Sequence, residues 1–245
     1  MGSLGTISAF STMFGKQHCT GAQGGVVFTK DTLLFARVRQ ISDRGKPYGA
    51  LGNPANLVAS LNFNQDEISM AIGRVQLEKL SGAIGARRAF VSLVETGLQE
   101  VDSVSLIGDA PNCAGSYWFL MLRLDISKLS CDSQEFARAL LEEGIGGVSA
   151  GYPFFPTDQP WHQDAVVFGK SGLPWSAVCA QPKPQHFELP NARQANRMIV
   201  RVDVYESLGT AEARDLVTAV KKVTRHYRSP SQSVTAVHTS QAVHI

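Results

Sequence analysis

The chain has 245 residues, 44% of them hydrophobic, and its 23 basic and 21 acidic residues leave a net charge of only +2. This composition is typical of one large or two small globular domains, and the near-neutral charge gives no indication of a nucleic-acid or membrane partner. No apolar run reaches the roughly 20 residues that span a bilayer, and the first residues lack the apolar core of a signal peptide, so we expect a cytoplasmic protein. The four cysteines are far apart and the six histidines form no ligand pair, so we expect neither disulfides nor a metal site.

Two short strands are predicted near the N-terminus, with a lysine between them. Residues 7–11 have the composition of the end of a buried strand, and residues 26–29 form a second, β-branched strand. Lys16 lies between them among small and apolar residues. Burial disfavours the ammonium form of a lysine and leaves a nucleophilic amine, which is what a Schiff-base lysine requires. The alternative from spacing alone is a solvated lysine, because most lysines lie at the surface.

The same segment has two features that suit a cofactor carrying a phosphate. Ser11, five positions before Lys16, has a hydroxyl that can anchor a phosphate. Gly21, Gly24 and Gly25 allow the backbone to turn sharply and to approach a flat cofactor closely. Lys16 is therefore the leading catalytic candidate, with Ser11 as a binding candidate beside it.

Two helices follow, separated by a long loop over residues 45–59. The first is predicted to begin at about Asp31, with apolar residues at helical spacing. Asn64 is predicted to cap the second, with Glu67 three positions later as in a capping box. One face of this second helix is apolar, at Ile68, Ile72 and Val75.

The second half of the chain predicts a small α+β domain with an antiparallel sheet. Period-two patterning predicts strands over residues 116–125 and 198–205. Helical spacing predicts helices over residues 133–143, ended by Gly144, and 210–227.

The residues around Lys16 resemble the lysine motif of the DegT/DnrJ/EryC1/StrS family of pyridoxal-phosphate (PLP) aminotransferases. In that motif an S-F-x-x-x-K-like stretch precedes a turn that ends in Gly-Gly, as Gly24 and Gly25 do here. A second match lies at residues 62–80, NFNQDEISMAIGRVQLEKL, which resembles the family segment N-Y-R-M-x-x-x-x-A-A-I-G-x-x-Q-L-x-K-L nearly position for position. Two motifs in the same order make chance a poor explanation.

The resemblance implies an α/β fold, namely the C-terminal part of the PLP-dependent transferase fold type I. Residues 1–85 would be the C-terminal part of the PLP-binding large domain, and residues 86–228 the small α+β domain. The tail at 229–245 is expected to be disordered, since it is polar and lacks periodicity. Family members carry a long stretch before the lysine, which supplies the carboxylate on the pyridine nitrogen and the stacking aromatic. We therefore expect the chain to be a C-terminal fragment or a truncated gene model.

The resemblance also implies an activity, the ping-pong transfer of an amino group from an amino-acid donor, glutamate in this family, to a keto sugar or related ketone. Lys16 would bind PLP as a Schiff base and carry the proton during the transfer. Ser11 would hold the cofactor phosphate. Asn62 would reach the phosphate of the neighbouring subunit in a homodimer with shared active sites.

Two alternatives remain open. One is a non-catalytic dimerisation or regulatory fragment of such an enzyme. The other is a PLP-dependent sugar dehydratase, although those relatives replace the lysine with histidine and Lys16 argues against it. The chain also departs from the family at Gln23, where relatives often carry an acidic residue, and at Asn64, where they often carry arginine. These departures put recognition of a substrate carboxylate there in doubt.

Overall fold

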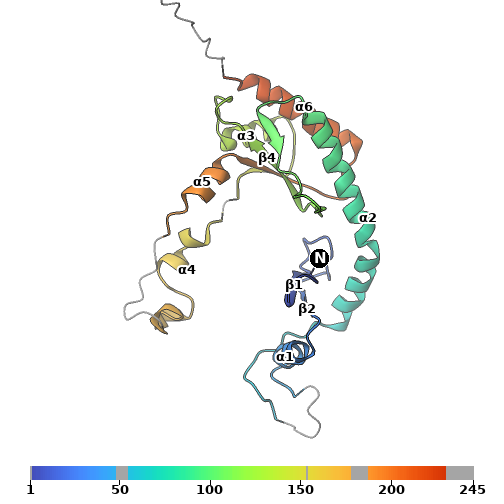
Figure 1. Cartoon of the computed structure of the whole chain (residues 1–245), viewed down its shortest axis with the longest axis vertical. Coiled ribbons are helices and arrows are strands. Elements are labelled where there is room, and N and C mark those ends of the chain that lie inside the picture. The colour runs from blue at the N-terminus through green and yellow to red at the C-terminus, as the bar shows by residue number, and fades with distance from the viewer. Residues whose placement is uncertain (1, 48–54, 153, 178–186, 230–245) are drawn as a thin grey trace, which may run out of the picture. The chain divides into compact units, whose positions relative to one another are not determined.

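The computed structural model describes residues 2–47, 55–152, 154–177 and 187–229 (Figure 1). The chain divides into two compact units, residues 1–88 and 89–245. The predicted disordered tail lies outside the described residues apart from Ser229, and so does the centre of the predicted loop at 45–59.

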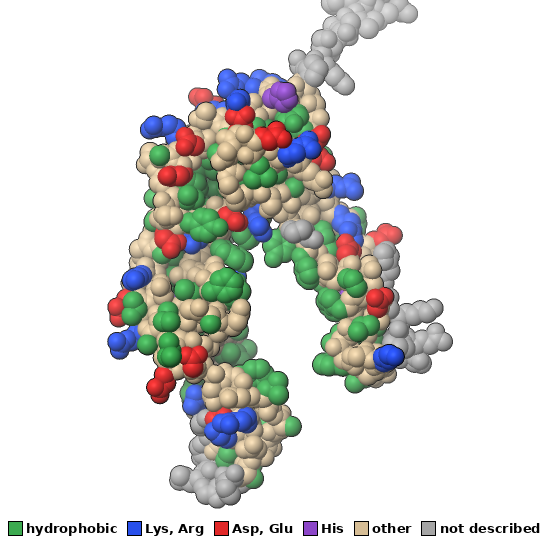
Figure 2. Space-filling model, turned by 180° about the vertical axis from the view of Figure 1, so that it is seen from behind, with side chains coloured by type: hydrophobic (Ala, Val, Ile, Leu, Met, Phe, Trp, Pro, Cys, Tyr) green, Lys and Arg blue, Asp and Glu red, His purple; other side chains and the backbone are tan. Residues whose placement is uncertain are grey.

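Both predicted strands of the first unit are present. They are β1 (Ile7–Ser11) and β2 (Gly25–Thr29), which pair antiparallel from Ile7 opposite Thr29 to Ser11 opposite Gly25. Their large side chains are partly exposed, although α1 contacts β2. These exposed side chains are Ile7, Phe10, Val26, Val27 and Phe28. Figure 2, which views the molecule from behind, shows hydrophobic side chains at many places on its surface.

The first helix, α1 (Thr32–Ser42), begins where the sequence predicts. Asp31 caps it, since its carboxylate accepts hydrogen bonds from the backbone N–H groups of Leu33 at 2.8 Å and Leu34 at 3.0 Å. Such a cap satisfies donors that the first helical turn leaves unpaired.

The second helix, α2 (Glu67–Leu98), runs for 32 residues, and its predicted cap is wrong. Asp66 occupies the capping position instead of Asn64, because its carboxylate accepts from the backbone N–H and the hydroxyl of Ser69, both at 2.8 Å. These hydrogen bonds lower the pKa of the Asp66 carboxyl, the backbone N–H of Ser69 contributing most. A carboxylate at a helix N-terminus is also favoured by the helix dipole, which the neutral side chain of Asn64 is not.

The second unit contains the predicted antiparallel sheet. Its strands are β3 (Val104–Leu106), β4 (Phe119–Leu124), β5 (Val148–Ala150) and β6 (Ile199–Asp203), in the spatial order β3-β4-β6-β5. Every neighbouring pair is antiparallel. Burial alternates along β4 and β6, so that one face of the sheet is fully buried and the other is partly open.

Three helices pack on the buried face of this sheet, namely the part of α2 after Arg88, α3 (Ser133–Glu142) and α6 (Thr210–His226) (Figure 1). Their fully buried side chains include Val94, Phe136 and Leu216. Each buried side chain of this size contributes about 1.5–3 kcal/mol. This core forms the stable centre of the second unit.

The segment between β5 and β6 contains short elements that the sequence did not predict. They are the 3-10 turns η1 (Pro156–Asp158), η2 (Gly169–Ser171) and η3 (Trp175–Ala177), and the helices α4 (Pro160–Gln163) and α5 (Pro190–Arg197). Among the described helices of the chain, none is long and apolar enough to cross a membrane.

Candidate functional site

Lys16 lies in the loop that joins β1 to β2, and the backbone of this loop is closely tied. Thr12 N–H donates to the carbonyl of Gly24 at 2.9 Å, and Phe14 N–H donates to that of Ala22 at 2.8 Å. The Lys16 N–H donates to the carbonyl of Met13 at 2.9 Å, which fixes the turn that presents the lysine. The Lys16 side chain is partly buried. The loop therefore holds the backbone of Lys16 at a defined place.

Two threonines that the sequence analysis missed form the centre of the loop. Thr12 and Thr20 are 1% and 2% exposed, and their hydroxyl oxygens lie 3.1 Å apart. A Cβ at Gly24 would lie 2.6 Å from Thr12 Oγ1 and 2.7 Å from Thr20 Oγ1, so only glycine fits there. The glycine run before β2 is the signal that could have revealed this close packing.

The lysine loop packs against the start of α2. His18 Nε2 lies 2.9 Å from the carbonyl oxygen of Gly73, and this carbonyl can only accept, so Nε2 is the donor. A Cβ at Gly73 would lie 2.9 Å from Thr20 Cγ2, and one at Gly21 would lie 2.9 Å from Ile72 Cδ1. The two sequence motifs, at 10–25 and 62–80, are therefore in direct contact within the first unit.

Ser11, at the end of β1, is exposed on the same loop as Lys16. Its Oγ accepts a hydrogen bond from Met13 N–H at 3.4 Å. This contact uses the oxygen as acceptor and leaves the hydroxyl hydrogen to donate, which is the role that a phosphate ligand demands.

Asn62 lies on a separate segment, before α2. It forms an isolated antiparallel bridge with Asp43, and its Oδ1 accepts from Asn64 N–H at 3.1 Å. Because this turn uses the carbonyl oxygen of the side chain, the exposed NH2 group is the part that can donate to a ligand. Ser11 and Lys16 thus share one loop, whereas Asn62 lies on a separate segment, where it pairs with Asp43.

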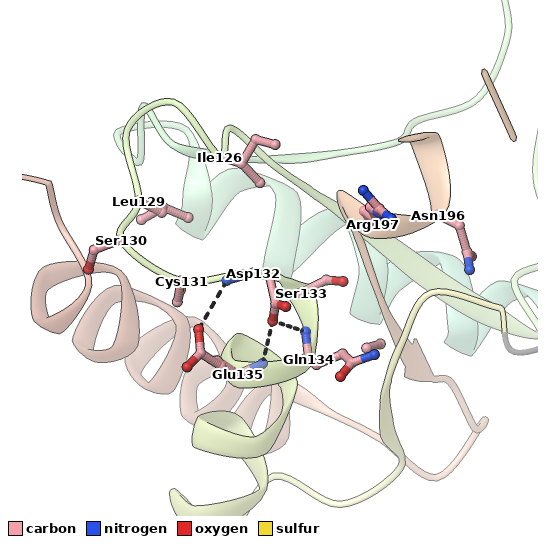
Figure 3. A pocket seen from close by; sticks show the side chains of 11 residues that line it. Ile126, Leu129, Ser130, Cys131, Asp132, Ser133, Gln134, Glu135, Asn196 and Arg197 are labelled. Carbon is pink, nitrogen blue, oxygen red and sulfur yellow. Dashed lines mark hydrogen bonds between the residues drawn. The ribbon is translucent and has the colours of Figure 1, made fainter. Parts of the chain in front are cut away.

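The predicted residues do not line the larger cavities. In the first unit, a cavity of about 750 Å³ lies against β2, α1 and residues 63–65. In the second, one of about 690 Å³ lies at the start of α3, where Asp132 accepts from the N–H groups of Gln134 and Glu135 (Figure 3). Neither lining includes Lys16, Ser11 or Asn62.

The cysteine in the second of these cavities is not a reactive one. Desolvation first, and then the charges of Glu135 and Asp132, raise the pKa of the Cys131 thiol to about 11. The thiol therefore stays protonated at neutral pH, and a protonated thiol is a poor nucleophile.

Comparison with proteins of known sequence shows remote relatives. GDP-perosamine synthase of Escherichia coli O157:H7 is 24% identical over 153 residues, which cover 62% of this chain and 40% of the relative. GDP-perosamine synthase of Caulobacter vibrioides is 33% identical over 98 residues, which cover 40% of this chain and 25% of the relative.

Comparison with solved structures confirms the predicted fold. An aminotransferase from Psychrobacter cryohalolentis matches 93% of this chain and 58% of its own, with a TM-score of 0.73 at 20% identity. A GDP-4-keto-6-deoxymannose-3-dehydratase, solved with a trapped PLP-glutamate geminal diamine, matches 90% of this chain and 56% of its own, with a TM-score of 0.67 at 15% identity. At these identities the likeness establishes the fold alone.

The family itself is shown by a family model. The chain spans less than half the length of the curated relatives and little more than half that of the solved chains. The model of the DegT/DnrJ/EryC1/StrS aminotransferase family nevertheless matches residues 1–221, nine-tenths of the sequence. The chain belongs to the DegT/DnrJ/EryC1/StrS aminotransferase family.

Proposed function

We propose that this chain carries the catalytic lysine of a PLP-dependent aminotransferase, which moves an amino group from an amino-acid donor, glutamate, to a keto sugar or related ketone. Family membership supports the reaction class. The observation that carries the proposal is the contact between the loop of Lys16 and α2 at Gly73, which joins the two family motifs. In this proposal residues 1–85 belong to the PLP-binding domain and residues 86–228 form the small domain.

The described residues fit the lysine and phosphate ends of PLP. Lys16 is partly buried on a loop whose backbone is fixed by hydrogen bonds, and Ser11 has a hydroxyl hydrogen free to donate on the same loop. The backbone of Gly24 packs directly against the buried side chains of Thr12 and Thr20 and leaves no room for a side chain of its own. When bound, PLP supplies an electron sink for the carbanion formed at the substrate α-carbon.

The protein side chains bind, orient and transfer the proton. Lys16 Nζ would take the proton from the α-carbon of the donor as a general base. In the second half-reaction it would give a proton, as a general acid, to the acceptor carbon that receives the amino group. Ser11 Oγ donates to the phosphate. Asn62 donates its side-chain NH2 to the phosphate of the partner in a homodimer. The exposure of Asn62 and the bond that already occupies its Oδ1 support this role.

Chemical trapping tests the proposal. Addition of PLP to the full chain should produce a visible absorption band, and borohydride should fix the cofactor on Lys16, identified by peptide mapping. Lys16→Ala should lose both signals. Lys30→Ala is the matched control, because Lys30 is an exposed lysine at the end of β2 and should be trapped normally.

The alternatives predict different results. A regulatory or dimerisation fragment would give no band and no labelled lysine under conditions in which the chain is folded. A sugar dehydratase would release the deoxygenated sugar instead of an amino sugar. The dehydratase match establishes only the fold, and Lys16 stands where dehydratases of the family carry histidine, so we favour amino transfer.

A further inference from the structure

The four-stranded sheet of the second unit has one face that the three helices do not cover. Strand register places two rows of side chains there. Met121, Arg201 and Ser149 form one row across β4, β6 and β5. Phe119 and Asp203 form the next, with Gly147 at its end, since Asp203 N–H donates to the Gly147 carbonyl at 2.9 Å. Arg201 and Asp203 therefore lie side by side on the open face.

Arg201 is held in place by aromatic rings. Its Cζ lies 5.4 Å from the ring centroid of Phe119 and 5.9 Å from that of Tyr152, both within the range of cation–π attraction. The Arg201 side chain is 26% exposed, so part of the guanidinium remains accessible. An arginine fixed between rings loses little conformational entropy when it binds a ligand.

Two polar atoms in this region lack partners. Among the described residues, neither Ser149 Oγ nor Arg201 Nε makes a hydrogen bond, although both atoms are buried. Arg201 Nε lies 3.5 Å from Asp203 Oδ1, an ion pair without hydrogen-bond geometry. Buried donors in folded proteins normally have a hydrogen-bond acceptor. Ser149 and Arg201, which lie directly opposite each other on β5 and β6, therefore have the capacity to bind an additional acceptor.

The neighbouring backbone leaves the acidic residue accessible. A Cβ at Gly147 would lie 3.1 Å from Asp203 Cβ and 3.5 Å from Asp203 Oδ2, so a side chain at this position would cover the carboxylate. The φ of Gly147 is +69°, a conformation that also favours glycine. The Asp203 side chain is 32% exposed.

We propose that this face binds a zwitterionic α-amino acid. Arg201 and Ser149 donate hydrogen bonds to its carboxylate, and Asp203 binds its ammonium group. The paired charges select this class of ligand: Asp203 repels a dianion such as phosphate, whereas it attracts the ammonium that accompanies an amino-acid carboxylate. The binding of this amino acid does not depend on the proposed function.

Calorimetric titration of the full chain with L-glutamate, without PLP, tests the proposal. We expect Arg201→Gln to weaken binding at least tenfold and Arg201→Lys to weaken it less. Asp203→Asn should weaken binding of L-glutamate but not of N-acetyl-L-glutamate, which has no ammonium group. The matched control is Arg123→Gln, which removes the same charge from an exposed arginine on the same sheet face and should leave affinity unchanged. Circular dichroism verifies that each variant is folded.

Three results would overturn the proposal: no binding to the wild-type chain, unchanged affinity in folded Arg201 and Asp203 variants, or an equal loss in Arg123→Gln. The result of the glutamate titration can be distinguished from the result of the trapping experiment at Lys16. Arg201-dependent binding without trapping at Lys16 would refute only the amino-transfer proposal. Trapping at Lys16 without Arg201-dependent binding would refute only the amino-acid site.

Discussion

His18 Nε2 donates a hydrogen bond to the Gly73 carbonyl oxygen over 2.9 Å, across 55 positions of sequence. This bond ties the loop of Lys16 to the first turns of α2. The two family motifs therefore form one structural unit, in which the helix fixes the position of the lysine. The predictions below test the parts of that unit in turn.

Replacement of Lys16 by alanine is expected to abolish amino transfer without unfolding the chain. In the proposed function Lys16 is both anchor and proton carrier, and loss of general acid–base help alone typically costs about 10²–10⁴-fold in rate. Steady-state turnover, with thermal unfolding as the control for stability, measures the effect. Near-normal turnover in a folded Lys16→Ala variant would remove Lys16 from the catalytic role.

Replacement of Ser11 by alanine should weaken cofactor binding. The change would delete the proposed hydrogen bond to a charged phosphate, worth about 1.5–3 kcal/mol, which corresponds to roughly a tenfold to 150-fold higher Kd for PLP. Because Ser11 is exposed, the free energy of unfolding of the chain should hardly change. Titration of the visible absorption band measures Kd, and an unchanged value would exclude Ser11 from the phosphate site.

The role of Asn62 across a dimer interface can be tested by complementation. Lys16→Ala and Asn62→Asp chains should each be inactive, yet heterodimers of the two should regain activity, because one of their two sites has both wild-type residues. Aspartate is chosen because a negative charge beside the phosphate is more unfavourable than a lost neutral hydrogen bond. Activity is measured on heterodimers isolated with two affinity tags. No recovery there would mean that Asn62 does not serve the partner's site.

Two glycines of α2 should respond to alanine in opposite ways. A Cβ at Gly73 would lie 2.9 Å from Thr20 Cγ2, whereas one at Gly82 would have nothing within 4 Å. Gly82→Ala should therefore stabilise the chain by about 0.5–1 kcal/mol, because alanine is the better helix former. Gly73→Ala gains the same helix preference but must displace the lysine loop, at a cost of about 1–3 kcal/mol. Denaturant unfolding measures the free energy of unfolding of both variants. Equal changes in Gly73→Ala and Gly82→Ala would show that the Lys16 loop does not pack on Gly73.

The sequence predicts the regular elements well, because their signals are local. The start of the first helix at about Asp31 and the alternation along β6 depend on residues a few positions apart, and both agree with the structure. The cap at Asn64 was wrong because two capping residues lie two positions apart, and only the bonds from Ser69 distinguish them. Pattern alone could not rank the two.

The candidate site was only partly visible in the sequence. Lys16 and Ser11 could be identified because they lie within one motif. The Thr12–Thr20 contact and the bond from His18 to Gly73 could not, since they depend on how a loop folds back on itself and on a distant helix. Likewise, Arg201 and Ser149 become neighbours only through the pairing of β5 with β6, which are separated by almost 50 residues of sequence.

The strand pair β1–β2 leads to a prediction about the chain as given. Val27, at the centre of β2, is 48% exposed and Phe10 opposite Val26 is 41% exposed, so a two-stranded sheet presents large apolar side chains and open edges. Such a pair is marginally stable alone and is a ready template for further strands. We expect residues 1–245 to self-associate, with weak hydrogen-exchange protection over residues 7–29.

A single charged side chain on β2 should reduce self-association of the chain without unfolding it. Val27→Lys is expected to shift the chain towards monomer in light scattering, because charged side chains on strand edges oppose pairing. Leu4→Ser is the control, since Leu4 is fully exposed but lies outside the strand pair, and its variant should associate as the wild type does. A wild-type monomer with strong protection over residues 7–29 would contradict the prediction, because the apolar faces of β1 and β2 would then need no further cover.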